Sequence, residues 1–391
     1  MIATRHKRAR VVVTGILFWY PLAGVTFQFL HYLVGLRRLG YDVYYAEDPS
    51  QWIYDPILHD LSPDATRNVE IVAPILAKHG FEGRWAFRGN YAGGRAYGMP
   101  EAQVRQLYRD ADALLNVTGQ ELREEHLACG LRIYVESDPF SFQVKVAQGD
   151  DKTIAHLAAH HVHFTFGENL GAPDCLVPTG RFSWLPTRQP IVLDLWEAAP
   201  AVREAAYTTV ATWKNPDWKE IEYQGVRYYW SKGRELEKIL DLPRKRPVPF
   251  EIALRVDDGV EALLRENGWR VVSSLDISQD LDCYRSYILN SRGEFSVAKD
   301  QYVRPRTGWF SDRSACYLAA GRPVITQETG FSKILPTGKG LHAWSTMEGI
   351  CTAIDAIESD YQGQCRAARE VAAEYFAAEK VLDSLMQRAG L

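Results

Sequence analysis

The chain has 391 residues, a formal net charge of −4, 24% charged residues and 46% hydrophobic residues. This length predicts about two domains, and the composition is typical of an ordinary globular protein. The negative net charge argues against nucleic acid as the main partner. No apolar run reaches the roughly 18 residues that a membrane-spanning helix needs.

The cysteines give no sign of a disulfide framework or a zinc site. They are Cys129, Cys175, Cys283, Cys316, Cys351 and Cys365. None belongs to a CxxC pair, and most lie in apolar runs, as free buried thiols do. Arg5, Lys7 and Arg8 precede apolar residues, but no small-residue cleavage pattern follows them. We therefore expect a protein of the reducing cytoplasm.

The amino-terminal end predicts a βαβ unit. A β-branched strand at 10–15 leads into a loop that contains Gly24. Residues 25–39 have the apolar periodicity of a helix, and 41–46 form a second strand. The unit lacks a GxGxxG pattern, so we expect no dinucleotide binding. Gly24 either lets the backbone approach a phosphate or sugar, or is an ordinary turn glycine.

Two later strands of this half end beside groups that can accept a proton. Asp138 follows a strand at 132–136, and His163 and Glu168 flank a strand at 163–167. In open α/β sheets, ligands bind at the carboxyl ends of the strands. Each of these three residues is therefore a candidate general base. The alternatives are a turn at Asp138 and a hydrogen-bonded core position for His163.

Histidines are concentrated just before the second of these strands. His156 and His160 would share one face of a predicted helix at 153–160, and His161 and His163 follow. The sequence has no HExxH pattern or carboxylate spacing that would fix a metal ion here. We therefore expect no metal site and no bound cofactor.

Prolines mark the expected link between two domains. Pro186, Pro190 and Pro200 lie in the segment 180–205, which we interpret as this link. The expected units are a first Rossmann-like domain at 1–200, a second at 201–370 and a closing helix at 371–391.

Strands and helices alternate through the second half. Strands are predicted at 207–213, 250–256 and 269–275, with a helix at 259–267 between the last two. This spacing predicts a second parallel sheet. Lys214, directly after the first of these strands, either contacts a phosphate or is a solvated loop lysine.

Residues 293–340 carry the most specific pattern in the chain. A basic, turn-rich loop precedes a helix that Ser311 or Asp312 can cap, and Gly321 ends this helix before a buried strand at 323–325. A helix N-terminus offers N–H groups and partial positive charge to a phosphate. The plain alternative is a βαβ unit without a ligand.

Polar side chains flank this helix on both sides. Arg306 and Arg313 add positive charge, and Gln327 and Glu328 supply groups suited to sugar hydroxyls. The predicted anion and sugar contacts are Lys214, Arg306, Gly308, Ser311, Asp312, Arg313, Gln327, Glu328, Thr329 and Gly330.

This stretch resembles the nucleotide-sugar half of GT-B glycosyltransferases of families 1 and 4. Those enzymes have small-Gly-x-Pro-Val after the helix and then a polar loop, which here read AGRPV at 320–324 and Gln-Glu at 327–328. The glutamate pair typical of family 4 is replaced by Gly308 and Cys316. Val25 stands where family 1 enzymes often have a catalytic histidine.

The resemblance implies an α/β GT-B fold, with two Rossmann-like domains whose parallel sheets face each other across a cleft. The last helix would pack back toward the first domain. It also implies a hexosyltransferase-type enzyme (EC 2.4) that transfers a sugar from a nucleotide-diphosphate sugar to a small-molecule or glycan acceptor without a metal ion. Two alternatives are a nucleotide-sugar 2-epimerase of the same fold and a nucleotide-sugar-binding protein without turnover.

Overall fold

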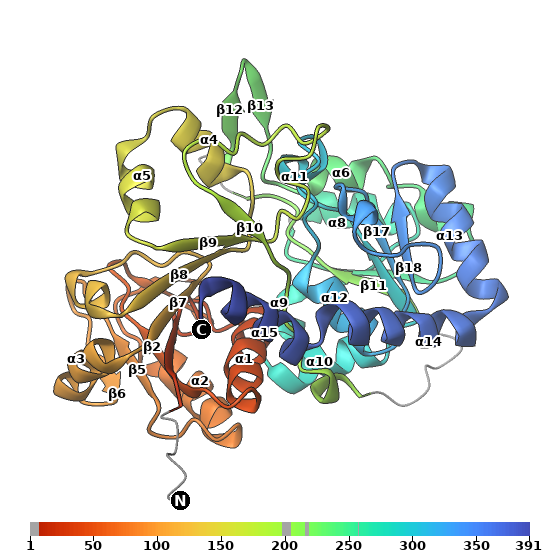
Figure 1. Cartoon of the computed structure of the whole chain (residues 1–391). Coiled ribbons are helices and arrows are strands. Elements are labelled where there is room, and N and C mark those ends of the chain that lie inside the picture. The colour runs from red at the N-terminus through yellow and green to blue at the C-terminus, as the bar shows by residue number, and fades with distance from the viewer. Residues whose placement is uncertain (1–7, 198–204, 216–218, 257) are drawn as a thin grey trace, which may run out of the picture.

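The computed structural model describes residues 8–197, 205–215, 219–256 and 258–391. These residues form two α/β halves, each built on its own sheet, that lie side by side (Figure 1). Arg5, Lys7, Pro200, Pro216 and the expected domain boundary at 200 and 201 lie outside the described residues. The prediction of an α/β fold with two parallel sheets is confirmed, apart from one antiparallel edge strand.

The first half contains an eight-stranded sheet in the order β10-β9-β8-β7-β1-β2-β5-β6, in which only β6 runs antiparallel to its neighbour. Its strands are β1 (Arg10–Thr14), β2 (Asp42–Glu47), β5 (Trp85–Arg88), β6 (Ala96–Gly98), β7 (Ala113–Val117), β8 (Leu131–Glu136), β9 (Val162–Thr165) and β10 (Trp184–Pro186). The helices are α1 (Ala23–Arg38), α2 (Thr66–Lys78), α3 (Glu101–Asp110), α4 (Ser141–Ala147) and α5 (Asp151–Ala158), with 3₁₀ helices at Glu124–Ala128 and Leu193–Trp196 and a hairpin of β3 (Ile53–Asp55) and β4 (Asp60–Ser62).

The second half contains a six-stranded parallel sheet in the order β15-β14-β11-β16-β17-β18. Its strands are β11 (Tyr207–Val210), β14 (Phe250–Leu254), β15 (Arg270–Ser273), β16 (Gly293–Ser296), β17 (Val324–Gln327) and β18 (Leu341–Trp344), and a separate hairpin consists of β12 (Ile221–Tyr223) and β13 (Val226–Tyr228). The helices are α6 (Gly233–Glu237), α7 (Leu242–Lys245), α8 (Asp258–Glu266), α9 (Ser274–Ser278), α10 (Leu281–Leu289), α11 (Asp300–Val303), α12 (Asp312–Ala319) and α13 (Met347–Ser359), with a 3₁₀ turn at Phe331–Lys333.

Strand β1 shows why the first sheet is buried on both faces. Val11, Val12 and Val13 are all inaccessible to solvent. Val11 and Val13 belong to the cluster that includes Leu33 of α1, whereas Val12 packs with Tyr108 of α3 on the opposite face. Successive side chains of a strand point to opposite faces, so an unbroken β-branched run requires helices on both sides of the sheet.

The closing segment links the two halves. It consists of α14 (Tyr361–Val371), a π-helical turn (Ala372–Phe376) and α15 (Ala378–Ala389), and in Figure 1 it runs from the second half, on the right, to α1 of the first half, on the left. The closing helix expected at 371–391 therefore consists of the π-helical turn followed by α15. Helix α15 packs on α1, where Gly35 leaves room for Ala378 and Leu382.

One other predicted element differs in extent. The strand expected at 207–213 ends at Val210. Gly24, expected in a loop, lies in the first turn of α1.

Candidate functional site

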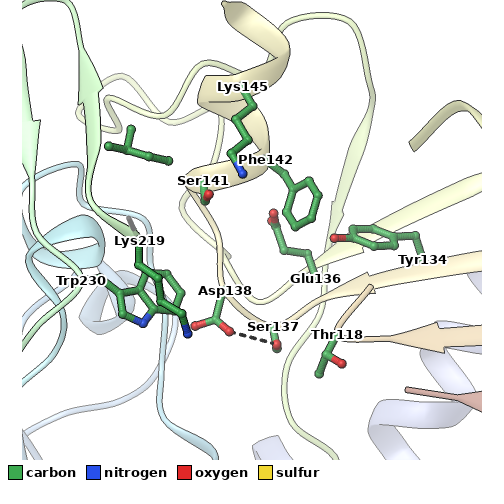
Figure 2. A pocket seen from close by; sticks show the side chains of 11 residues that line it. Thr118, Tyr134, Glu136, Ser137, Asp138, Ser141, Phe142, Lys145, Lys219 and Trp230 are labelled. Atoms are coloured by element: carbon green, nitrogen blue, oxygen red, sulfur yellow. Dashed lines mark hydrogen bonds between the residues drawn. The ribbon is translucent and has the colours of Figure 1, made fainter. Parts of the chain in front are cut away.

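A cavity of about 220 Å³ lies between the two halves, at the carboxyl ends of β7 and β8 (Figure 2). It is lined by Thr118, Tyr134, Glu136, Ser137, Asp138, Ser141, Phe142, Lys145, Lys219, Ile221 and Trp230. The first half contributes residues of β8 and α4 to the wall. The second half contributes Lys219, Ile221 and Trp230, which lie in or next to the β12–β13 hairpin. Gln148 donates a 2.8 Å hydrogen bond to the Glu222 carbonyl and ties α4 to this hairpin. We call this space the inter-half cavity.

Glu136, the last residue of β8, is 2% exposed. Its Oε2 accepts hydrogen bonds from Gln143 at 2.6 Å and Thr165 at 2.7 Å, whereas Oε1 has no partner among the described residues. Burial raises the pKa of Glu136 to about 8, although the two hydrogen bonds oppose this rise. Figure 2 shows the side chain turned toward Ser141 and Phe142. A buried carboxyl group with a free oxygen beside a cavity is suited to proton transfer near neutral pH.

Asp138, predicted as a general base, is brought to the same cavity. Its side chain is 44% exposed, and Oδ1 lies 2.8 Å from Lys299 Nζ and accepts a hydrogen bond from Tyr302. Burial favours the neutral form, but Lys299 and Tyr302 outweigh burial and hold the pKa of Asp138 below its usual value. Asp138 is therefore an ion-pair partner between the halves and a weaker base than Glu136.

Positive charge gathers on the second half beside this ion pair. Lys232, at the start of α6, is 9% exposed, and its ammonium group forms no hydrogen bond within the described residues. Burial, followed by the nearby charges of Arg313 and Lys299, lowers the pKa of Lys232 well below its usual value. An anion that entered this cluster would relieve the mutual repulsion of the cations.

Arg313, predicted as a phosphate contact, is held by the sheet. Its guanidinium donates to Glu294 at 2.6 Å, to the Val210 carbonyl at 2.6 Å and to Ser296 Oγ at 2.9 Å. Val210 and Ser296 are the last residues of β11 and β16. Arg313 therefore fixes two strand ends, and it contributes charge at the carboxyl edge of the sheet.

Helix α12 begins beside these cations. Ser311 occupies the N-cap position, but its hydroxyl caps no backbone N–H, so the predicted side-chain cap is wrong. Asp312 lies in the first turn, where burial and the charge of Asp138 raise its pKa to about 7 against the opposing effect of Arg313. Backbone N–H groups at an uncapped helix start remain available to a phosphate.

Gly308 and Gly330, predicted as donor contacts, serve the contact between the halves instead. A Cβ on Gly308 would lie 2.4 Å from the backbone nitrogen of Asn169, and one on Gly330 would lie 3.0 Å from the Asn169 side chain. Both glycines have positive φ, at +81° and +104°. Thr329 accepts from Gly308 N at 2.7 Å and donates to the Trp309 carbonyl at 2.6 Å, so it stabilises this loop pair.

Arg306, also predicted as a phosphate contact, has a carboxylate partner in the other half. Its Nε lies 2.7 Å from Asp174 Oδ2, and Lys333 pairs with the same carboxylate. The hydrogen bonds from Lys333 and Arg306 hold the pKa of Asp174 well below its usual value. Arg306 therefore forms an ion pair between the halves, and its role as a phosphate contact stays a prediction.

Gln327 and Glu328 line a second cavity, of about 180 Å³, at the end of β17. Both ends of the Gln327 amide are occupied, because Nε2 donates to Glu235 at 2.5 Å and Oε1 accepts from Ala298 N at 3.0 Å. The Glu328 carboxylate accepts from Gly330 N. Gln327 therefore acts within the core, and Glu328 organises the turn after β17.

His163 and Glu168, the other two predicted bases, line neither cavity. The imidazole of His163 is buried, with Nε2 2.8 Å from the Leu157 carbonyl, and burial lowers its pKa. This is the core position given above as its alternative. Burial raises the pKa of Glu168, and the 2.6 Å ion pair with Arg188 opposes this rise.

Lys214 and Gly24 remain outside the cation cluster. Lys214 is exposed in the loop after β11. A Cβ on Gly24 would lie 3.6 Å from the hydroxyl of Tyr284, so this helical glycine faces α10 of the second half.

Across the described residues, no three His, Cys, Asp or Glu side chains are arranged to hold a metal ion. The helices in that part of the chain are all too short or too polar to cross a membrane.

From the two carboxylates that end the strand at 132–136, the sequence analysis chose Asp138 rather than Glu136, and it did not select Lys232. Both carboxylates fit the strand-end rule equally well. Nothing in the neighbourhood of Lys232 along the chain marks it as buried.

With this geometry in view, solved structures can be compared. An α-glucosyltransferase in complex with UDP and a 13-mer DNA matches with a TM-score of 0.58 and 8% identity, over 99% of this chain and 100% of that chain. HepE of Anabaena in complex with UDP and glucose matches at 0.56 and 11%, over 98% and 100%. Sucrose-phosphate synthase of Thermosynechococcus elongatus matches at 0.53 and 11%, over 97% and 98%.

The fold is GT-B. This confirms the fold expected from residues 293–340. No protein-family model and no curated protein matches the sequence.

Proposed function

We propose that the protein transfers a sugar from a nucleotide-diphosphate sugar to an acceptor hydroxyl in the inter-half cavity. The observation that carries this proposal is the cation cluster of Lys232, Lys299 and Arg313 beside the uncapped start of α12. Lys299 pairs with Asp138 and Arg313 with Glu294, whereas Lys232 forms no ion pair within the described residues. It lies next to a cavity that contains the carboxyl groups of Glu136 and Asp138. The α-glucosyltransferase and HepE, which share the fold, were solved with UDP.

The proposed roles follow from where charge develops. The bond between the sugar and the diphosphate breaks, and the diphosphate leaves with the electron pair. Lys232, Lys299 and the first-turn N–H groups of α12 would stabilise that negative charge. Because protein cations perform this task, we propose a reaction that needs no metal ion, and unchanged activity after EDTA treatment would support this.

The proton of the acceptor would go to a carboxylate of the cavity. Glu136 suits this step better than Asp138, because Asp138 is already paired with Lys299. Transfer to a positioned base typically accelerates a reaction by about 10²–10⁴-fold.

The first test is the binding of UDP, GDP, ADP and dTDP, measured by titration calorimetry on wild type and Lys232→Met. We expect one or more diphosphates to bind and the variant to lose roughly 1.5–3 kcal/mol, or about tenfold to more than a hundredfold in Kd. Lys78→Met is the control, because Lys78 is an exposed lysine of α2 that belongs to neither cavity. Wild type that binds no diphosphate at millimolar concentration would refute the donor site.

Product analysis with the matching nucleotide sugars separates the proposal from its alternatives. A glycosylated acceptor supports the transferase. An epimerised donor formed without any acceptor indicates a 2-epimerase, and tight binding without turnover indicates a binding protein.

A further inference from the structure

Three aromatic side chains line the inter-half cavity. Tyr134 lies on β8, Phe142 on α4, and Trp230 comes from the second half. Tyr134 and Phe142 meet edge to face at 6.1 Å. Aromatic faces and edges pack well against sugar or aromatic rings. At about 220 Å³ the cavity is smaller than the roughly 300–1,000 Å³ of pockets for drug-sized ligands, so it suits a single ring.

Two lysines line the cavity. Lys145 on α4 and Lys219 of the second half both contribute to its wall, and Lys219 Nζ lies 5.3 Å from the centre of the Trp230 ring. The carboxyl groups of Glu136 and Asp138 line it as well. The charge of Asp138 is balanced by Lys299, and burial keeps Glu136 largely protonated at neutral pH.

Two polar atoms of residues in this wall, Glu136 Oε1 and Thr118 Oγ1, are buried without a hydrogen-bond partner among the described residues. Glu136 Oε1 has no hydrogen-bond partner among the described residues, although Oε2 has two. Burying such an atom without a partner costs free energy, which a ligand hydroxyl would recover. The cavity thus contains a hydroxyl-binding group, aromatic walls and two lysines.

We propose that the acceptor is a single hydroxylated ring that carries a carboxylate or phosphate group. Its ring packs between Phe142 and Trp230, its anionic group faces Lys145 and Lys219, and its reactive hydroxyl faces Glu136. This inference rests on the proposed function, because it names the acceptor class of that reaction. In the step, the acceptor O–H bond breaks and its proton goes to Glu136 in the ionised form, which is the minor form at neutral pH and increases as pH approaches 8. The oxygen forms a bond to the sugar carbon, and the bond from that carbon to the diphosphate breaks.

The test compares acids with their neutral twins. Saturation-transfer NMR and titration would measure binding of glucose 6-phosphate, glucuronate and 4-hydroxybenzoate against glucose, methyl glucuronate ester and methyl 4-hydroxybenzoate. Each is measured with and without excess UDP, so that an acid bound at the cation cluster is displaced and recognised. The variants are Lys145→Ala, Lys219→Ala and the double variant, with Lys78→Ala on the exposed face of α2 as control.

We expect at least one acid to bind more tightly than its neutral twin in the presence of UDP. Its Kd should rise about two- to fivefold in each lysine variant and roughly tenfold in the double variant, with no change in Lys78→Ala. The Kd of each neutral analogue should be the same for wild type and all variants.

Three results would overturn the inference: equal binding of acids and neutral twins, a preference for acids that survives in the double variant, or no acid bound at millimolar concentration. These results are independent of the diphosphate titration. A protein that binds UDP but prefers neutral rings has the proposed function and a different acceptor. A protein that binds no diphosphate loses the proposed function itself.

Discussion

Replacing Glu136 by glutamine should have opposite effects on the stability of the fold and on transfer activity. The pKa of Glu136 is about 8 in the folded protein, against an ordinary value of 4.5. Because the folded state holds the proton more tightly, the protonated carboxyl stabilises the fold fully below pH 4.5. Between these two pH values unfolding releases a proton, so stability falls as pH rises and levels off above pH 8.

The size of this effect follows from the pKa difference of about 3.5, which corresponds to roughly 4.8 kcal/mol. About 4 kcal/mol of this lies between pH 5 and pH 9. Glutamine does not titrate, so Glu136→Gln should gain in unfolding free energy relative to wild type by an amount of this order between these pH values. Asp138, Tyr134 and Tyr302 interact electrostatically with Glu136 and are the same in both proteins.

The assay is thermal unfolding of wild type and variant at pH 5, 7 and 9, with transfer activity measured in parallel. The variant should be relatively more stable at high pH, and its activity should fall by about 10²–10⁴-fold. Wild-type activity should rise as pH passes through about 8, because the base must be ionised. Identical pH dependence of unfolding in the two proteins would refute the idea of a protonated carboxyl group.

Two glycine substitutions test the contacts that join the halves. In thermal unfolding, Gly308→Ala should destabilise the protein by clearly more than Gly338→Ala. Both positions have positive φ, which costs alanine about 1 kcal/mol or more, but only at Gly308 would the new Cβ meet the Asn169 backbone, at 2.4 Å. Equal losses of stability would show that the halves are not packed there. Gly35→Ala should also destabilise the protein and expose α15 to limited proteolysis, because the alanine Cβ would lie 2.6 Å from Leu382. Inside a helix, alanine is normally more stable than glycine by about 1 kcal/mol. A rise in the unfolding midpoint would therefore contradict this packing.

Local patterns were sufficient to predict much of the fold. The run Val11–Val13 can be buried only in a sheet covered on both faces, and it is. The strand, helix and strand expected within 293–340 appear as β16, α12 and β17. These elements are determined by neighbours a few residues away, which periodicity and turn residues report directly.

The candidate site was harder to predict because its groups are defined by distant partners. Arg306 has the charge of a phosphate ligand, but Asp174 pairs with it from 132 positions away. Glu136 and Asp138 are equivalent by the strand-end rule, and only Thr165 and Lys299 distinguish a buried acid from an ion pair. Burial and pairing of this kind leave no trace in the spacing of residues along the chain.

The connection between the halves has a mechanical consequence. Ile191, on the way into the second half, is bridged in parallel to Ala377, on the way back. Ile191 N donates to the Phe376 carbonyl at 2.7 Å, and Ala378 N donates to the Ile191 carbonyl at 2.9 Å. The two segments that connect the halves are thus hydrogen-bonded to each other at one place. From this pairing we expect any opening of the halves to be a rotation about these paired segments, which would bring Lys299 back to Asp138 on closing.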